Sequence, residues 1–159
     1  MNDKYELTNE TIDVIGHTLH RIKALKDFGL VCKGDLGGYV ESEDNLSSRG
    51  NCWVYDDGCV FGNGSVSDSG QVHANGWVYG HGCVYDHGSV SDHGWVCDNG
   101  HVFENGRVRG DGRIFESGSV RGNGCVCDDG IVAGNGRIDG DGCVTGDGRV
   151  FDNGHVFGD

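Results

Sequence analysis

The chain has 159 residues, about the length of one domain, and contains 31 glycines but no proline, which excludes collagen. The formal net charge of −13 argues against direct binding to nucleic acid, which needs a basic surface. The sequence contains no apolar run of about 18 residues and no signal segment. It therefore predicts a cytoplasmic protein that binds neither nucleic acid nor membranes.

Residues 1–50 differ in composition from the rest of the chain, since all four lysines lie there. The segments 5–7, 11–15 and 18–25 have the residue pattern of strands, and a hairpin around residues 15–17 would join the last two. The first coil of a repeat structure must be covered to protect its open strand edge. We therefore expect residues 1–50 to form a small β cap on a repeat domain of residues 51–159.

From Val54 onward the sequence repeats every six residues without an insertion. An aliphatic residue occupies every sixth position up to Val156, and all of these are valines except Ile114 and Ile138. Glycine lies four residues after each of them in all seventeen complete repeats, up to Gly154. So short and regular a period indicates a solenoid, in which each unit is stable only when stacked on others.

Each six-residue unit is expected to form a short strand and a corner. Residues two apart on a strand point to the same side, so Gly58 and Val60 face inward together while the residues beside the valine face outward. The two following positions carry mostly residues that tolerate tight turns. Three units per coil predict an all-β fold, a single-stranded triangular β-helix of about six coils.

The repeat resembles the hexapeptide-repeat family of left-handed β-helices. The inward aliphatic and inward small residues of that family match Val60 and Gly64, and the equivalent pair in every repeat. The resemblance implies a left-handed helix, with acyl transfer as the commonest activity. The small position is normally Ala, Ser, Thr or Val, but here it is always Gly, so we expect a thinner core.

The leader has a narrower resemblance. Residues 34–47, GDLGGYVESEDNLS, and residues 50–56, GNCWVYD, are similar to the entry motif of phage- and prophage-encoded hexapeptide-repeat proteins. Residues 17–28 match as well. These relatives are described as polymer-forming or acyltransferase-like, so the resemblance implies a phage-derived protein.

The wall that contains Val60 carries the most apolar outward residues. Residues eighteen apart stack on the same wall, and five of the six rows on this wall include an aromatic residue. Large apolar patches are rare on monomers, so this stripe predicts an interaction surface, or a surface that the leader covers. We name as the interaction stripe Phe61, Trp77, Tyr79, Trp95, Phe115, Ile131 and Phe151.

An isolated chain is expected to be marginally stable, because glycine adds no side chain to the core and loses much backbone entropy on folding. The last coil, at residues 155–159, is expected to present a bare strand edge. We therefore predict a homodimer or homotrimer, formed through this edge or through the stripe. A host protein is a further possible partner.

The histidines give little indication of catalysis. Acyltransferases of the family typically use a catalytic histidine and bind CoA in a cleft between subunits. Here His81, His87 and His93 lie at three successive corners and cannot form one site, which leaves His73 and His101, on the walls, as candidates for a general base. No insertion forms a substrate pocket, so we predict no catalytic residue and no cofactor.

Metal binding is not predicted either. Aspartates such as Asp56, Asp92 and Asp128 are expected to stack along one corner, but the repeat here is six residues long, whereas that of the Ca²⁺-binding β-roll is nine. Cys125 and Cys127 are closer in sequence than a Cys-x-x-Cys zinc motif, so free thiols are expected. The sequence favours a non-catalytic structural or interaction module that self-associates. The alternatives are an acyltransferase with a site between subunits, and an acidic inhibitor of a host defence or nucleic-acid-handling protein.

Overall fold

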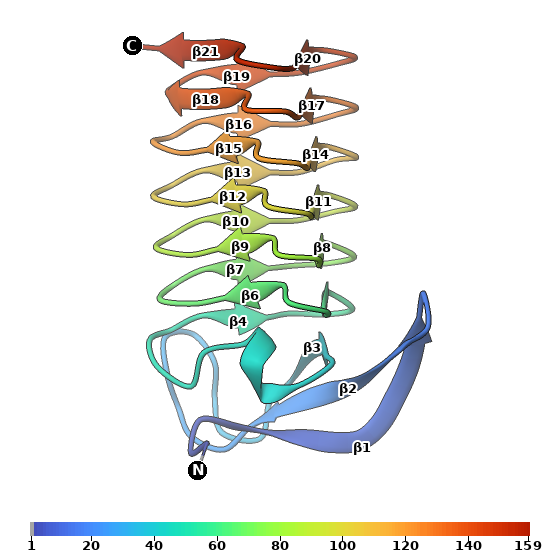
Figure 1. Cartoon of the computed structure of the whole chain (residues 1–159). Helices are drawn as coiled ribbons and strands as arrows, with labels where there is room; N and C mark the ends of the chain where they lie inside the picture. The colour runs from blue at the N-terminus through green and yellow to red at the C-terminus, as the bar shows by residue number, and fades with distance from the viewer. Residues whose placement is uncertain (1) are drawn as a thin grey trace.

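The computed structural model describes residues 2–159, which form a parallel β-solenoid (Figure 1). The predicted all-β class is confirmed, with one short 3₁₀ helix, η1 (Glu43–Asn45). From β4 onward, successive strands go to three different sheets in turn, so the sheets are the three walls of the solenoid. Within residues 2–159, no helix is long and apolar enough to cross a membrane.

The first wall consists of nine strands, three of which come from the leader. In spatial order they are β1 (Tyr5–Val14), β2 (His17–Ala24), β3 (Leu36–Val40), β5 (Cys59–Val60), β8 (Trp77–Val78), β11 (Trp95–Val96), β14 (Arg113–Ile114), β17 (Ile131–Val132) and β20 (Arg149–Val150).

The other two walls have six strands each. The second wall contains β4 (Trp53–Val54), β7 (Gln71–Val72), β10 (Ser89–Val90), β13 (Arg107–Val108), β16 (Cys125–Val126) and β19 (Cys143–Val144). The third contains β6 (Ser65–Val66), β9 (Cys83–Val84), β12 (His101–Val102), β15 (Ser119–Val120), β18 (Arg137–Gly140) and β21 (His155–Gly158).

The core is a column of aliphatic side chains. Every valine or isoleucine of the repeat from Val54 to Ile138 is at most 1% exposed, and each stacks on the residue eighteen positions away. The inward glycines bring the backbones close together: a Cβ on Gly88 would lie 2.5 Å from the carbonyl oxygen of Val102 in the next coil. No side chain larger than hydrogen therefore fits at such a position without movement of the neighbouring coil.

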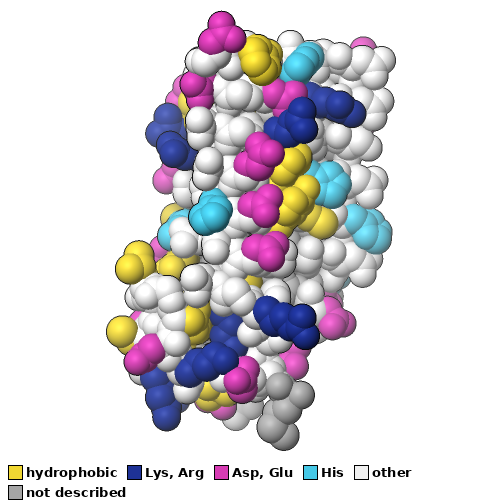
Figure 2. Space-filling model, turned by 90° about the vertical axis from the view of Figure 1, so that its left-hand side faces the viewer, with side chains coloured by type: hydrophobic (Ala, Val, Ile, Leu, Met, Phe, Trp, Pro, Cys, Tyr) yellow, Lys and Arg dark blue, Asp and Glu magenta, His cyan; other side chains and the backbone are white. Residues whose placement is uncertain are grey.

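The corners have a recurring backbone conformation and are linked from coil to coil by side-chain hydrogen bonds. The first residue of each corner has a positive φ, and where it is not glycine it is usually aspartate, as at Asp92 with φ 57°. The Asp92 carboxylate accepts a hydrogen bond of 3.0 Å from the amide of Gly110, one coil further. Asp128 and Gly146 repeat the contact at 3.1 Å. Figure 2 shows one face on which acidic side chains form a row along the stack.

The leader closes the beginning of the solenoid and shares its core. β1 and β2 form the predicted hairpin, with Ile15 and Gly16 in the turn. β3 pairs in parallel with β5, so the leader adds a strand to the stack ahead of the repeat. The hydroxyl of Tyr5 donates a 2.6 Å hydrogen bond to the carbonyl of Leu46, and the buried Lys4 ammonium donates to the Cys52 carbonyl at 2.8 Å.

Candidate functional site

The interaction stripe lies on the outer side of the first wall, and the hairpin covers its beginning. Phe61 is only 2% exposed, because Leu19 of β2 and the side chains of Ile12 and Val14 of β1 pack around it and Cys59. The prediction that Phe61 is available to a partner is therefore corrected. Its role is to join the leader to the first wall.

The stripe forms two columns of stacked rings, of which the second begins under the hairpin. In one column, Trp77 and Trp95 stack with centroids 5.4 Å apart and planes 7° apart, and the Arg113 guanidinium lies 4.8 Å from the Trp95 ring. In the other, Phe61 and Tyr79 stack at 5.1 Å. Both rings of the Trp pair are half-buried. Burial raises the pKa of the Tyr79 phenol.

Further along, the second column alternates large and small residues. Ala133 is fully buried between the rows of Phe115 and Phe151, and Cys97 is 8% exposed between those of Tyr79 and Phe115. Phe151, by contrast, remains 44% exposed. Ile131 lies beside them and is half-buried. A groove of about 300 Å³ follows the Trp pair, lined by Asn75, Trp77, His93, Trp95, Asp111 and Arg113.

The two wall histidines are held by their neighbours. His73 stacks on Tyr55 at 4.4 Å and shares a 3.0 Å hydrogen bond with Gln71, and burial lowers its pKa. His101 packs edge-on against Tyr85, and among the described residues its buried Nδ1 has no hydrogen-bond partner. Among residues 2–159, neither histidine shares a hydrogen bond with a carboxylate that would orient the ring as a base.

A third histidine, which the sequence pattern assigned only to the cap, has such a carboxylate. His17 Nδ1 lies 2.9 Å from Glu41 Oε1, and Glu41 Oε2 accepts a 2.7 Å hydrogen bond from the Gly62 amide. These two contacts, that of His17 first, lower the pKa of Glu41. Both residues line an open cavity of about 500 Å³ with Ser42, Asp44, Asn45 and Asn63.

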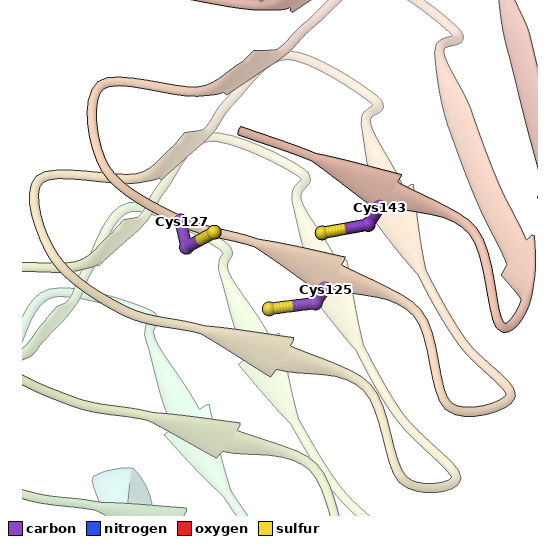
Figure 3. Close-up of side chains that lie close together, drawn as sticks. All are labelled: Cys125, Cys127 and Cys143. Carbon is purple, nitrogen blue, oxygen red and sulfur yellow. The ribbon is translucent and has the colours of Figure 1, made fainter. Parts of the chain in front are cut away.

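The second wall brings together three cysteines. The sulfurs of Cys125, Cys127 and Cys143 all lie within 4.8 Å of one another (Figure 3). Burial, followed by the two neighbouring thiols, raises the pKa of Cys127 to about 11. The spacing of cysteines within one coil does not predict this three-cysteine group, because Cys143 belongs to the next coil. The sequence feature that indicates it is the separation of Cys125 and Cys143 by eighteen residues, which stacks them on one wall.

Comparison with known proteins gives a partial match. No protein-family model matches the chain. The chain is similar to an uncharacterized acetyltransferase of Escherichia coli K12, YdcK, with 40% identity over 42 residues. The match spans 26% of this chain and 13% of the relative. The similarity is therefore confined to a short segment, whereas the stacked coils establish a parallel β-solenoid.

Proposed function

We propose that the chain is a rigid, non-catalytic interaction module that binds a second copy of itself through the outer side of the first wall. The stacked Trp77–Trp95 pair carries this proposal, because both rings stay partly exposed, although Trp77 also packs against the cluster that the hairpin covers. Aromatic residues of this kind dominate the energetics of interfaces. The exposed ring of Phe151 extends the apolar surface toward the last coils.

The distribution of charge supports a second copy as the partner. At the hairpin end of the wall, the carboxylates of Glu10 and Asp57 lie 3.5 and 3.7 Å from the one guanidinium of Arg21, beside the Lys23–Glu6 ion pair. At the far end the wall carries Arg113 and Arg149. A two-fold axis that pairs the walls in opposite directions brings the basic end of each copy toward the acidic end of the other. Because the coils of both copies have the same spacing, the interaction stripes of the two copies stay in register along the contact.

Light scattering at low and high salt tests the proposal. We expect the wild-type chain to be a dimer at both, and the variant Trp77→Glu/Trp95→Glu to be a folded monomer. The matched control is Tyr85→Glu/Phe103→Glu, which removes a stacked pair with centroids 5.0 Å apart on the third wall and should remain dimeric. A monomeric wild-type chain, or an unchanged mass for the Trp variant, would reject this interface.

A second candidate function, acyl transfer, is supported by the His17–Glu41 pair and by the acetyltransferase name of the similar E. coli protein. Glu41 would hold the proton on His17 Nδ1, so that Nε2 is free to act as a base. His17 would take a proton from an acceptor hydroxyl or amine as it attacks the thioester carbonyl of acetyl-CoA. The acetyl group would then join the acceptor, and the proton would leave with the CoA thiol.

Release of free CoA thiol from acetyl-CoA, measured against a panel of hydroxyl and amine acceptors, tests this second function. We expect His17→Gln to abolish release. His20→Gln is the control, because the His20 ring nitrogen lies 3.1 Å from the Thr8 carbonyl and the residue does not line the cavity. Release that survives in His17→Gln, or no release with any acceptor, would reject the base role.

A further inference from the structure

The three cysteines on the second wall take no part in either function proposed above. Cys125 of β16 and Cys143 of β19 are direct partners in the parallel pairing, so their side chains leave the wall side by side. Cys127 comes directly after β16, which ends at the inward Val126. Its sulfur points back toward the sulfurs of Cys125 and Cys143 (Figure 3). Within residues 2–159, this is the group of metal-ligating side chains whose donor atoms converge.

We propose that these three thiols bind one thiophilic divalent metal ion, of which Zn²⁺ is the biological example. Thiolates are soft ligands that select such ions over Mg²⁺ and Ca²⁺. A Zn–S distance of about 2.3 Å in a tetrahedral site places the sulfurs about 3.8 Å apart. Since no pair is now separated by more than 4.8 Å, each pair of sulfurs would have to approach by no more than about 1 Å to close the site.

The charge near the cluster favours a divalent ion. Arg107 pairs with Cys125 in the wall, so Arg109 lies one coil below Cys127 on the same face. This register puts the Arg109 side chain one row from Cys127, on the outer side of the wall that carries the thiols. Three thiolates and one divalent ion carry one net negative charge, and Arg109 neutralises it. A monovalent ion such as Cu⁺ would leave one charge uncompensated.

The burial of the three residues suits binding from solution. Cys127 is 7% exposed and forms the closed side of the cluster, whereas Cys143 is exposed and Cys125 is half-buried. An ion can therefore reach the sulfurs without any opening of the coils. Three protein ligands also leave a fourth position, which water would fill on the solvent side.

Cys83 provides a matched control within the same chain. Like Cys125, it occupies the outward position of a two-residue strand and is half-buried. Its sulfur contacts the hydroxyl of Ser65 at 3.4 Å, and it is not part of the three-thiol group. A serine at this position changes the thiol content of the surface without changing the proposed site.

Metal titration of the full, reduced chain tests the proposal. Reduction with a phosphine avoids adding a competing thiol. Calorimetry should give one Zn²⁺ per chain, with no binding of Mg²⁺ or Ca²⁺. Co²⁺ should give thiolate-to-metal charge-transfer absorption. Cys143→Ser should weaken Zn²⁺ binding more than about 100-fold, beyond the 10–100-fold typical of losing an outer-shell partner. Cys83→Ser should bind like wild type, and Arg109→Gln should bind more weakly than wild type.

Circular dichroism must show that Cys143→Ser is folded, which its exposed position favours. The proposal is overturned if the reduced wild-type chain binds no Zn²⁺, or if Cys143→Ser binds it with unchanged affinity. It is also overturned if Cys83→Ser weakens binding as much as Cys143→Ser does. A Co²⁺ complex without charge-transfer absorption would equally exclude the thiols as ligands.

Discussion

The α-carbon of Gly82 faces the carbonyl oxygen of Val96 so closely that a Cβ on Gly82 would lie 2.5 Å from that oxygen. The two residues belong to successive coils. The same approach recurs at the equivalent inward glycines, for example between Gly106 and Val120 at 2.6 Å. The invariant glycine of the repeat is therefore required by the distance between coils, not by a positive φ.

Gly82→Ala should destabilise the fold by about 1–3 kcal/mol, the usual cost of overpacking. Backbone surrounds this site and cannot give way locally. Gly76 is the matched comparison, because its nearest neighbours lie at 3.2 Å and include the movable methyl groups of two valines. Urea denaturation should show a smaller loss for Gly76→Ala. Equal losses would contradict the steric explanation.

Val96→Asp should prevent folding, because Val96 is fully buried in the middle of the aliphatic column with no cation to pair with a carboxylate. Far-ultraviolet circular dichroism and light scattering would detect an unfolded or aggregated chain. His93→Asp adds the same side chain at an exposed corner nearby and should fold normally. A folded Val96→Asp chain would mean that the column tolerates charge.

Asp92→Ala should cost about 1 kcal/mol, because it removes the acceptor for the Gly110 amide. Asp92→Asn should be close to neutral, since the amide oxygen can accept the same bond and asparagine tolerates the positive φ at this corner. Thermal unfolding of the two variants distinguishes the hydrogen bond from the charge. If both variants lose stability equally, the negative charge and not the bond is what matters.

Stability should depend on pH through Asp139, which is 6% exposed and lies between Arg121 and His155. Arg121 first, and His155 with it, hold the pKa of Asp139 below its ordinary value of 3.8. Because the folded state keeps this carboxylate ionised more readily than the unfolded chain does, its contribution is complete above that value. The contribution is lost as the pH falls through the lowered pKa of the folded state.

Urea denaturation at several pH values checks this dependence. Asp139→Asn should be less stable than wild type at neutral pH, and the difference should shrink in acid. Asp147→Asn, at an exposed corner, is the control and should follow the wild-type curve. A difference for Asp139→Asn that stays constant across the acid range would show that packing, and not ionisation, accounts for it.

The repeat made the architecture predictable in detail. Residues two apart share a side of a strand and residues eighteen apart stack, so the inward valines, the outward aromatics and the corners could all be placed from spacing alone. The hairpin around Ile15 was also predictable from local pattern. Local spacing does not give the path of the leader over the first wall, and so it could not reveal that Phe61 is covered.

The sequence by itself determined which side chains of the repeat fill the core and which face outward. In a strict six-residue period, the position of a residue within the unit fixes the side of the strand to which its side chain points. Only the tertiary structure decided which outward residues meet. His17 finds Glu41 because the hairpin folds back toward β3, and Cys127 joins Cys125 and Cys143 because a corner turns its sulfur across the boundary between coils. Such contacts depend on side-chain direction and on the packing of a non-repeating segment, which a linear period does not contain.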